Sequence, residues 1–149
     1  MKPLILLLAL AGAAGAEDAP GVHSPARAKM NWMLNCQGCH QANGAGTANG
    51  APNLAGEVSR FLGVKGGREF LTRVPGVANA GLPNDQLAEL LNWTLSTFDP
   101  GHLPAGFEPY NIDEIAAGRA AVLVSDAPEM RARLVEEFSA AEGTARKGD

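Results

Sequence analysis

Apolar residues recur at helical spacing in the first part of the chain. Ser24 and Pro25 are typical of a helix start, Ser as the N-cap and Pro as the first helical residue. The apolar residues that follow recur every three or four positions as far as Leu34. This pattern predicts a helix that runs directly into Cys36. A shorter helix is predicted over residues 67–74.

The later part of the chain shows the same periodicity. Asn84 is a suitable N-cap for a helix over residues 85–98, whose leucines lie along one face. Asn111 and Glu114 have the spacing of a capping box, which predicts a helix that ends near Ser125. A last helix is predicted over residues 128–141. No segment alternates as a strand does, so the chain is predicted to be mostly α.

Loops and overall composition complete this picture. Residues 41–56 are rich in Gly, Asn and Ala, and residues 99–109 hold three prolines and two glycines, so both segments are predicted to be loops, as is 75–83. The 149-residue chain has a formal net charge of −4, which argues against a nucleic-acid-binding protein. Its two cysteines are too few for a disulfide scaffold.

The first sixteen residues have the pattern of a secretory signal peptide. Lys2 precedes the apolar run PLILLLAL, and Ala14-Gly15-Ala16 fits a cleavage site before Glu17. The apolar stretch is shorter than the roughly 20 residues of a membrane-spanning helix. We therefore predict a signal peptide over 1–16, no membrane anchor after its cleavage, and a periplasmic protein.

The chemistry of the chain centres on Cys36-Gln37-Gly38-Cys39-His40, the C-x-x-C-H attachment signature of c-type haem. Each thiol adds to a haem vinyl group, and the adjacent His binds the iron. A thioredoxin-like redox motif would need a βαβ context that this sequence lacks. A zinc site would need a fourth ligand, and the other histidines, His23 and His102, are isolated. A structural disulfide stays possible in principle, but covalent haem is favoured.

Residues 24–98 resemble the class I cytochrome c family. The resemblance depends on the first helix, the motif Cys36-x-x-Cys39-His40, the pattern Pro52-x-Leu54-x-Gly56 and the helix from Leu87 to Leu95. It implies one covalent haem c bound by Cys36 and Cys39, with His40 as proximal iron ligand. It also implies that the carbonyl of Pro52 accepts a hydrogen bond from His40 and raises its basicity toward iron. The crossing of the first and last family helices would involve Met30, Trp32, Met33, Leu87, Leu91 and Trp93.

The resemblance also implies a division of the chain. Residues 17–98 would form the cytochrome c domain, and residues 99–149 a Pro/Gly-rich connection and a two-helix extension. The extension is expected to cover the haem domain first and to contact a partner second. Lys65, Arg68 and Arg73 form a basic cluster that would be solvated, pair with haem propionates or contact a partner.

The usual distal methionine of the family is missing. It would fall near Val74 or Pro75, yet no Met occurs between Met33 and Met130. The sequence therefore leaves the identity of the distal ligand undecided. One alternative is a five-coordinate iron, or an iron whose sixth position is filled weakly by water or by a polar side chain such as Asn79. The others are ligation by His102, by Met130 or by a desolvated Lys65. Met30, Met33 and His23 are poorly placed to reach the distal face.

The sequence thus predicts a periplasmic single-haem electron carrier, and not an enzyme, with a dedicated but unidentified redox partner protein. An alternative is a five-coordinate haem protein that binds or reacts with a small ligand. The distal loop offers no His, Arg or acid for peroxide chemistry. A further alternative is a haem subunit of a larger dehydrogenase or reductase complex, assembled through the C-terminal helices.

Overall fold

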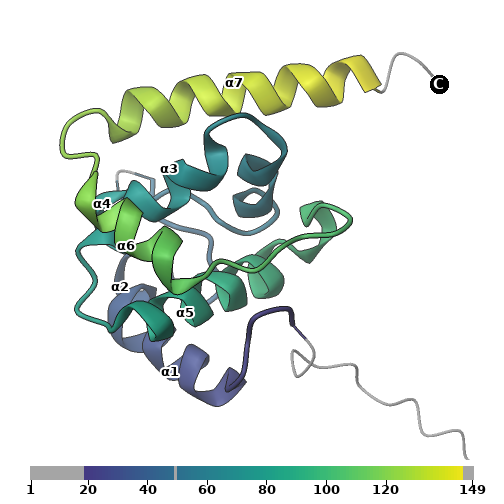
Figure 1. Ribbon diagram of the computed structural model, residues 1–149. Coiled ribbons are helices and arrows are strands. Elements are labelled where there is room, and N and C mark those ends of the chain that lie inside the picture. Colours follow the sequence, from purple (N-terminus) through teal and green to yellow (C-terminus); the bar gives the residue numbers. More distant parts are fainter. Residues whose placement is uncertain (1–18, 49, 146–149) are drawn as a thin grey trace, which may run out of the picture.

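A computed structural model describes residues 19–48 and 50–145 of the chain (Figure 1). The predicted signal peptide, residues 1–16, lies outside this part. Helices and short 3₁₀ turns make up the described elements, and these residues contain no strand. In chain order the elements are α1 (Pro25–Asn35), α2 (Gln37–His40), η2 (Val58–Gly63), α3 (Gly67–Arg73), α4 (Pro75–Ala78), α5 (Asn84–Phe98), η3 (Pro100–His102), α6 (Ile112–Ala120) and α7 (Ala127–Ala145). The structure is therefore mostly α, as the sequence predicts.

Helices α1 and α5 cross and bury an aromatic cluster. Ala28 is fully buried on α1, which lets the two helices approach closely. The ring centroids of Trp32 and Trp93 lie 6.0 Å apart, and those of Trp32 and Phe98 lie 4.5 Å apart. The expected contribution of Met30 and Met33 to this crossing is wrong, because both face outward and are 54% and 49% exposed. The resemblance to the family implied these two residues, but on α1 the crossing is made by Ala28 and Trp32.

A buried carboxylate fixes the start of α1 against α5. Glu89 is 3% exposed, and its Oε1 accepts hydrogen bonds from the backbone N–H groups of His23 and Ser24 at 2.8 and 2.7 Å. Its Oε2 accepts from Nε of Arg27 at 2.8 Å. These three donors compensate for the burial of the charge. The contact sets the direction in which α1 leads toward Cys36.

The start of α5 differs from the prediction. Asn84 is the first residue of the helix, Pro83 precedes it as the N-cap, and the Asn84 side chain makes no cap. Its Oδ1 accepts a hydrogen bond from Nη1 of Arg119 at 2.6 Å instead. The predicted loop over 75–83 also contains the single-turn helix α4. A side chain from the extension thus replaces the local cap that the sequence predicts.

The C-terminal helices share the core of the rest of the molecule. The capping box of Asn111 and Glu114 is present at the start of α6, as predicted, although the helix ends at Ala120 and not near Ser125. Helix α7 lies across α3 and η2 at the top of Figure 1. Leu134 and Phe138 of α7 are buried, and the rings of Phe138 and Phe61 pack edge to face with their centroids 5.3 Å apart.

None of the helices in residues 19–48 and 50–145 combines the length and apolar character needed to cross a membrane.

Candidate functional site

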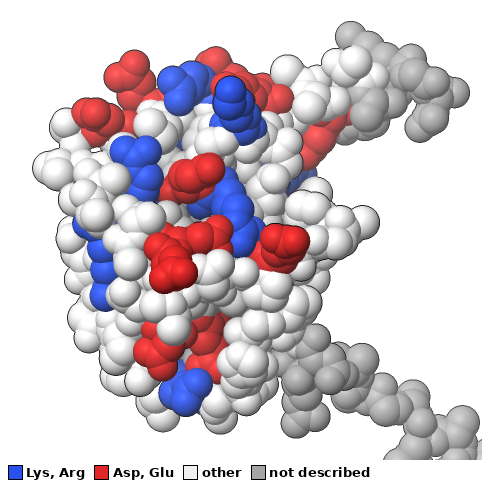
Figure 2. Space-filling view, in the orientation of Figure 1, with Lys and Arg blue, Asp and Glu red and all other residues white. Residues whose placement is uncertain are grey.

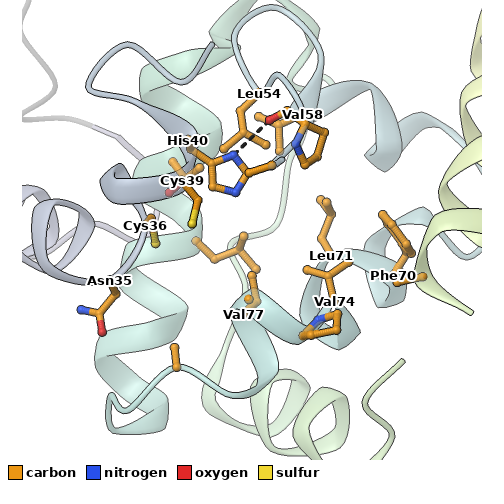
Figure 3. A pocket seen from close by; sticks show the side chains of 18 of the residues that line it. Asn35, Cys36, Cys39, His40, Leu54, Val58, Phe70, Leu71, Val74 and Val77 are labelled. Atoms are coloured by element: carbon orange, nitrogen blue, oxygen red, sulfur yellow. Dashed lines mark hydrogen bonds between the residues drawn. The ribbon is translucent and has the colours of Figure 1, made fainter. Parts of the chain in front are cut away.

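A cavity of about 670 Å³ opens between α1, α3, α4 and α5. Its lining is largely apolar, with side chains such as Leu54, Val58, Leu71, Val77 and Leu90. A volume of several hundred Å³ with mostly apolar walls and a few polar groups is typical of cofactor sites. Cys36, Cys39 and His40 line the same cavity, so the C-x-x-C-H motif faces the space that a flat apolar cofactor would need (Figure 3).

The motif occupies a tight turn at the end of α1. Cys36 ends α1 and precedes α2, and its carbonyl oxygen accepts from the N–H groups of Cys39 and His40 at 3.2 and 3.0 Å. This single helical turn holds both thiols beside the imidazole. Cys36 is half-buried and Cys39 is exposed. Burial, with a smaller effect of Cys39, raises the pKa of the Cys36 thiol to about 11.

The imidazole of His40 is oriented by Pro52. Nδ1 of His40 lies 3.0 Å from the carbonyl oxygen of Pro52 (Figure 3). Burial lowers the pKa of His40, and the hydrogen bond to Pro52 opposes this effect only in part. The neutral ring therefore donates from Nδ1 and keeps the lone pair of Nε2 for a metal.

The loop that carries Pro52 is fixed by close backbone contacts. Gly46 donates its N–H to the carbonyl oxygen of His40 at 3.0 Å, and Leu54 donates to that of Gly44 at 2.8 Å. Gly46 has a φ of 69°, and a Cβ there would collide with the carbonyl oxygen of Ala51. Only glycine meets both conditions. Gly46 is thus a site residue that sequence reasoning placed only in a generic loop.

These residues fit a covalently bound haem. Cys36 and Cys39 would hold it through thioether bonds, His40 would supply Nε2 to the iron, and the apolar walls would enclose the porphyrin. Arg131 is the one side chain with a full charge among the described residues that line the cavity. Its Nη2 donates to Oε1 of Glu57, and its guanidinium lies 5.9 Å from the Phe61 ring centroid.

The structure places the candidate distal ligands away from the cavity. Nδ1 of His102 lies 2.5 Å from Oδ1 of Asp99, which anchors the ring in η3. Met130 is partly buried against the core, but it does not line the cavity. The other side chains considered from the sequence do not line the cavity either; they are those of His23, Met30, Met33, Lys65 and Asn79.

The predicted basic cluster does not reach the cavity either. Arg68 pairs with Glu114 through two hydrogen bonds of 2.6 and 3.0 Å, and its guanidinium lies 4.2 Å from the ring centroid of Tyr110. Nε of Arg73 donates to the carbonyl oxygen of Ala121 at 2.7 Å. Arg68 and Arg73 therefore join α3 to the extension, and pairing of these two residues with haem propionates is not what the structure shows.

Sequence reasoning missed the contribution of the extension to the cavity. The first turn of α7 supplies Ala127, Pro128 and Arg131 to the lining. The periodicity predicted this helix, but no local signal indicates where it packs. The contact between α7 and the cavity depends on residues that are far apart in the sequence.

Comparisons with known proteins agree with this site. The family model for cytochrome c matches residues 25–97. Two curated proteins from Thermus thermophilus, each named cytochrome c-552, are 32% identical over 103 residues. The match covers 57% of this chain, and it covers 79% of one relative and 70% of the other. No solved structure matches the chain significantly.

Proposed function

Since the chain belongs to the cytochrome c family, we propose that it is a periplasmic electron carrier that serves a dedicated redox partner protein. The family assigns it one haem c and a role in electron transfer. When bound, the haem iron gains and loses one electron between Fe(III) and Fe(II), and no substrate bond forms or breaks. The observation that carries the function is the placement of Cys36, Cys39 and the Pro52-bonded His40 on one wall of an apolar cavity.

The residues around the cavity are held by packing and hydrogen bonds, an arrangement that suits electron transfer. His40 is fixed by Pro52, and the crossing of α1 with α5 is packed by Trp32, Trp93 and Phe98. A cofactor held by two covalent bonds in such a frame needs little rearrangement when its charge changes.

An exposed apolar surface on α1 supports a partner contact. Met30, Met33 and Leu34 face outward, with Leu34 74% exposed, and Cys36 and Cys39 follow them directly. Exposed apolar side chains beside a cofactor attachment site are typical of an interaction surface. On the face shown in Figure 2, acidic and basic side chains are interspersed. We therefore place the partner contact on the exposed side of α1.

The cofactor is tested by mass and by redox spectroscopy. The purified protein should carry the mass of one haem, and its visible spectrum should change reversibly on reduction and reoxidation. Cys36→Ala or Cys39→Ala should leave a single thioether bond. A protein without covalent haem, or one whose iron cannot be cycled, would contradict the function.

The partner surface is tested by electron self-exchange between the ferric and ferrous protein, measured by NMR. Leu34→Gln should slow the exchange, because it removes apolar contact area next to the attachment site. Val124→Gln is the matched control, since Val124 is 84% exposed in the segment between α6 and α7. Equal rates for both variants would contradict the placement on α1.

The periplasmic location is tested by fractionation of cells that express the full chain. The haem-loaded protein should be released with the periplasmic fraction, and its N-terminus should be Glu17. Recovery with the membrane fraction, or with residues 1–16 still attached, would contradict this part of the proposal.

A further inference from the structure

The two sides of the cavity differ in chemistry. His40 and the two cysteines lie on one side, and Leu71, Val74 and Val77 lie across from them (Figure 3). Pro75, Gly76 and Ala80 extend this second wall. We refer to these six residues as the distal wall. None of their side chains carries nitrogen, oxygen or sulfur, so the distal wall has no side-chain group that can bind iron.

Asn35, Asn53 and Thr94, which also line the cavity, make hydrogen bonds within the protein, whereas the buried Nε1 of Trp32, on the α1 side, has no partner among the described residues. Nδ2 of Asn35 donates to the carbonyl oxygen of Asn31 at 2.9 Å, and Oγ1 of Thr94 donates to that of Leu90 at 2.8 Å. The Asn53 side chain bonds both backbone groups of Ala55. Each of these side chains is thus held by a backbone partner, and all three lie outside the distal wall.

Arg131 is also held by a contact within the protein. Its charge is paired with Glu57, so the cavity has no free cation among its described lining residues. A small anion on the distal wall would lose its hydration without gaining a hydrogen bond or an opposite charge, which is costly. A small neutral molecule meets no such cost.

From these contacts we propose that the iron has no protein ligand on its distal side, and that the distal wall forms a binding pocket for a small neutral diatomic molecule. The inference rests on the proposed function, because it needs the haem that Cys36, Cys39 and His40 hold. It extends that function, since an iron with an open position binds a ligand as well as exchanging electrons.

The test uses carbon monoxide with the ferrous, haem-loaded protein and azide with the ferric protein. Without added ligand, the spectrum of the ferrous protein should be that of a high-spin iron. Carbon monoxide should change it to the spectrum of a low-spin iron. Azide should bind to the ferric protein far more weakly than carbon monoxide binds to the ferrous protein. His102→Ala and Met130→Leu should leave these spectra unchanged, because neither side chain lines the cavity.

A gain-of-ligand variant sharpens the test. Val77→Met should place a thioether on the distal wall, give a low-spin iron and weaken carbon monoxide binding by about tenfold or more. Ile112→Met is the matched control, because Ile112 is 53% exposed and outside the cavity. Val74→Met is a second variant at the same wall, in case Val77→Met does not fold.

The outcomes separate the inference from the proposed function. A low-spin ferrous protein that does not bind carbon monoxide would overturn the proposal that the distal position of the iron is open. The ligand would then be the residue whose substitution, His102→Ala or Met130→Leu, gives a high-spin iron. Azide binding as tight as that of carbon monoxide would overturn the neutral pocket. Failure of the proposed function would be visible earlier, as a protein mass without haem.

Discussion

The guanidinium of Arg119 in α6 lies 2.7 Å from the carbonyl oxygen of Leu82, in the loop that precedes α5. The same Nη2 is 2.7 Å from the carbonyl oxygen of Ala80, and Nη1 is 2.6 Å from Oδ1 of Asn84. One side chain of the extension thus satisfies three acceptors in the segment from Ala80, a residue of the distal wall, to Asn84. The extension therefore holds part of the distal wall in place through α6, in addition to lining the cavity with α7.

Arg119→Lys should loosen this segment. A lysine keeps the charge but lacks the planar fork that reaches three oxygen atoms. Hydrogen bonds to a charged group contribute about 1.5–3 kcal/mol, so we expect the free energy of unfolding to fall by roughly 2 kcal/mol in a denaturant titration. The rate of carbon monoxide binding should rise in the same variant.

Arg133→Lys is the control for this prediction. Arg133 is 65% exposed, and its Nε lies 3.9 Å from Glu137, so its loss should change stability by less than about 0.5 kcal/mol. Equal effects of the two substitutions would show that the bonds of Arg119 contribute no more than a surface charge.

Gly118→Ala should destabilise the contact between α3 and α6. A Cβ at Gly118 would lie 2.5 Å from Cβ of Thr72 and 2.6 Å from its carbonyl oxygen. Alanine gains about 1 kcal/mol in helix propensity, but forcing a methyl group into a packed contact costs about 1–3 kcal/mol. The difference leaves a net loss of about 1 kcal/mol in the free energy of unfolding, the middle of the range of about 0–2 kcal/mol.

Gly143→Ala offers a matched comparison within α7. A Cβ at Gly143 would meet nothing within 4 Å, so only the propensity gain remains, reduced by the closeness of the helix end. This variant should be as stable as the original chain or slightly more stable. If both alanine variants gained stability, that result would contradict the close contact between Gly118 of α6 and Thr72 of α3.

The local elements of the fold were predictable from the sequence. The Ser24-Pro25 start, the capping box of Asn111 and Glu114, and the periodicity of α5 depend on neighbouring residues, and the structure contains all three. The short 3₁₀ turn η2 was missed, because its six residues show no period that separates it from a loop.

The candidate site was predictable where it is local and unpredictable where it is not. Cys36, Cys39 and His40 are contiguous, so their grouping needs no tertiary information. The roles of Glu89, Arg119 and Arg131 depend on partners between 35 and 74 positions away. A charged residue on a helix gives no local sign of a partner that lies so far away in the sequence.

Tyr110 should make the protein sensitive to alkaline pH. Its hydroxyl donates to the carbonyl oxygen of Arg68 at 2.8 Å, and the residue is 3% exposed. Burial, opposed by the charge of Arg68, raises the pKa of Tyr110 above its ordinary value of 10.0. The fold therefore favours the neutral phenol. This contribution is complete below pH 10 and is lost as the pH rises from 10 toward the higher pKa of the folded state.

Tyr110→Phe isolates this effect. The variant should lose about 0.5–1.5 kcal/mol at neutral pH, because it lacks the hydrogen bond, and its stability should fall less steeply than that of the original chain above pH 10. Because Tyr110 is the only tyrosine of the chain, tyrosinate absorbance follows it directly. Identical slopes of stability against pH in the two proteins would contradict the raised pKa.

Leu134→Ala should show that α7 belongs to the core that encloses the cofactor. Leu134 is 1% exposed and lies one turn before Phe138, which packs on Phe61 of the cavity lining. Removing a buried leucine side chain costs about 2–5 kcal/mol, so a denaturant titration of the haem-loaded protein should reveal a loss of this size. Glu136→Ala, at an exposed position of the same helix, should change the free energy of unfolding by less than about 0.5 kcal/mol.

A chain ending at Phe98 should lose cooperative unfolding, because Ile115, Leu123, Leu134 and Phe138 leave the core together. If that shortened chain unfolded cooperatively with unchanged stability, the extension would be a separate cover, as its sequence alone suggests.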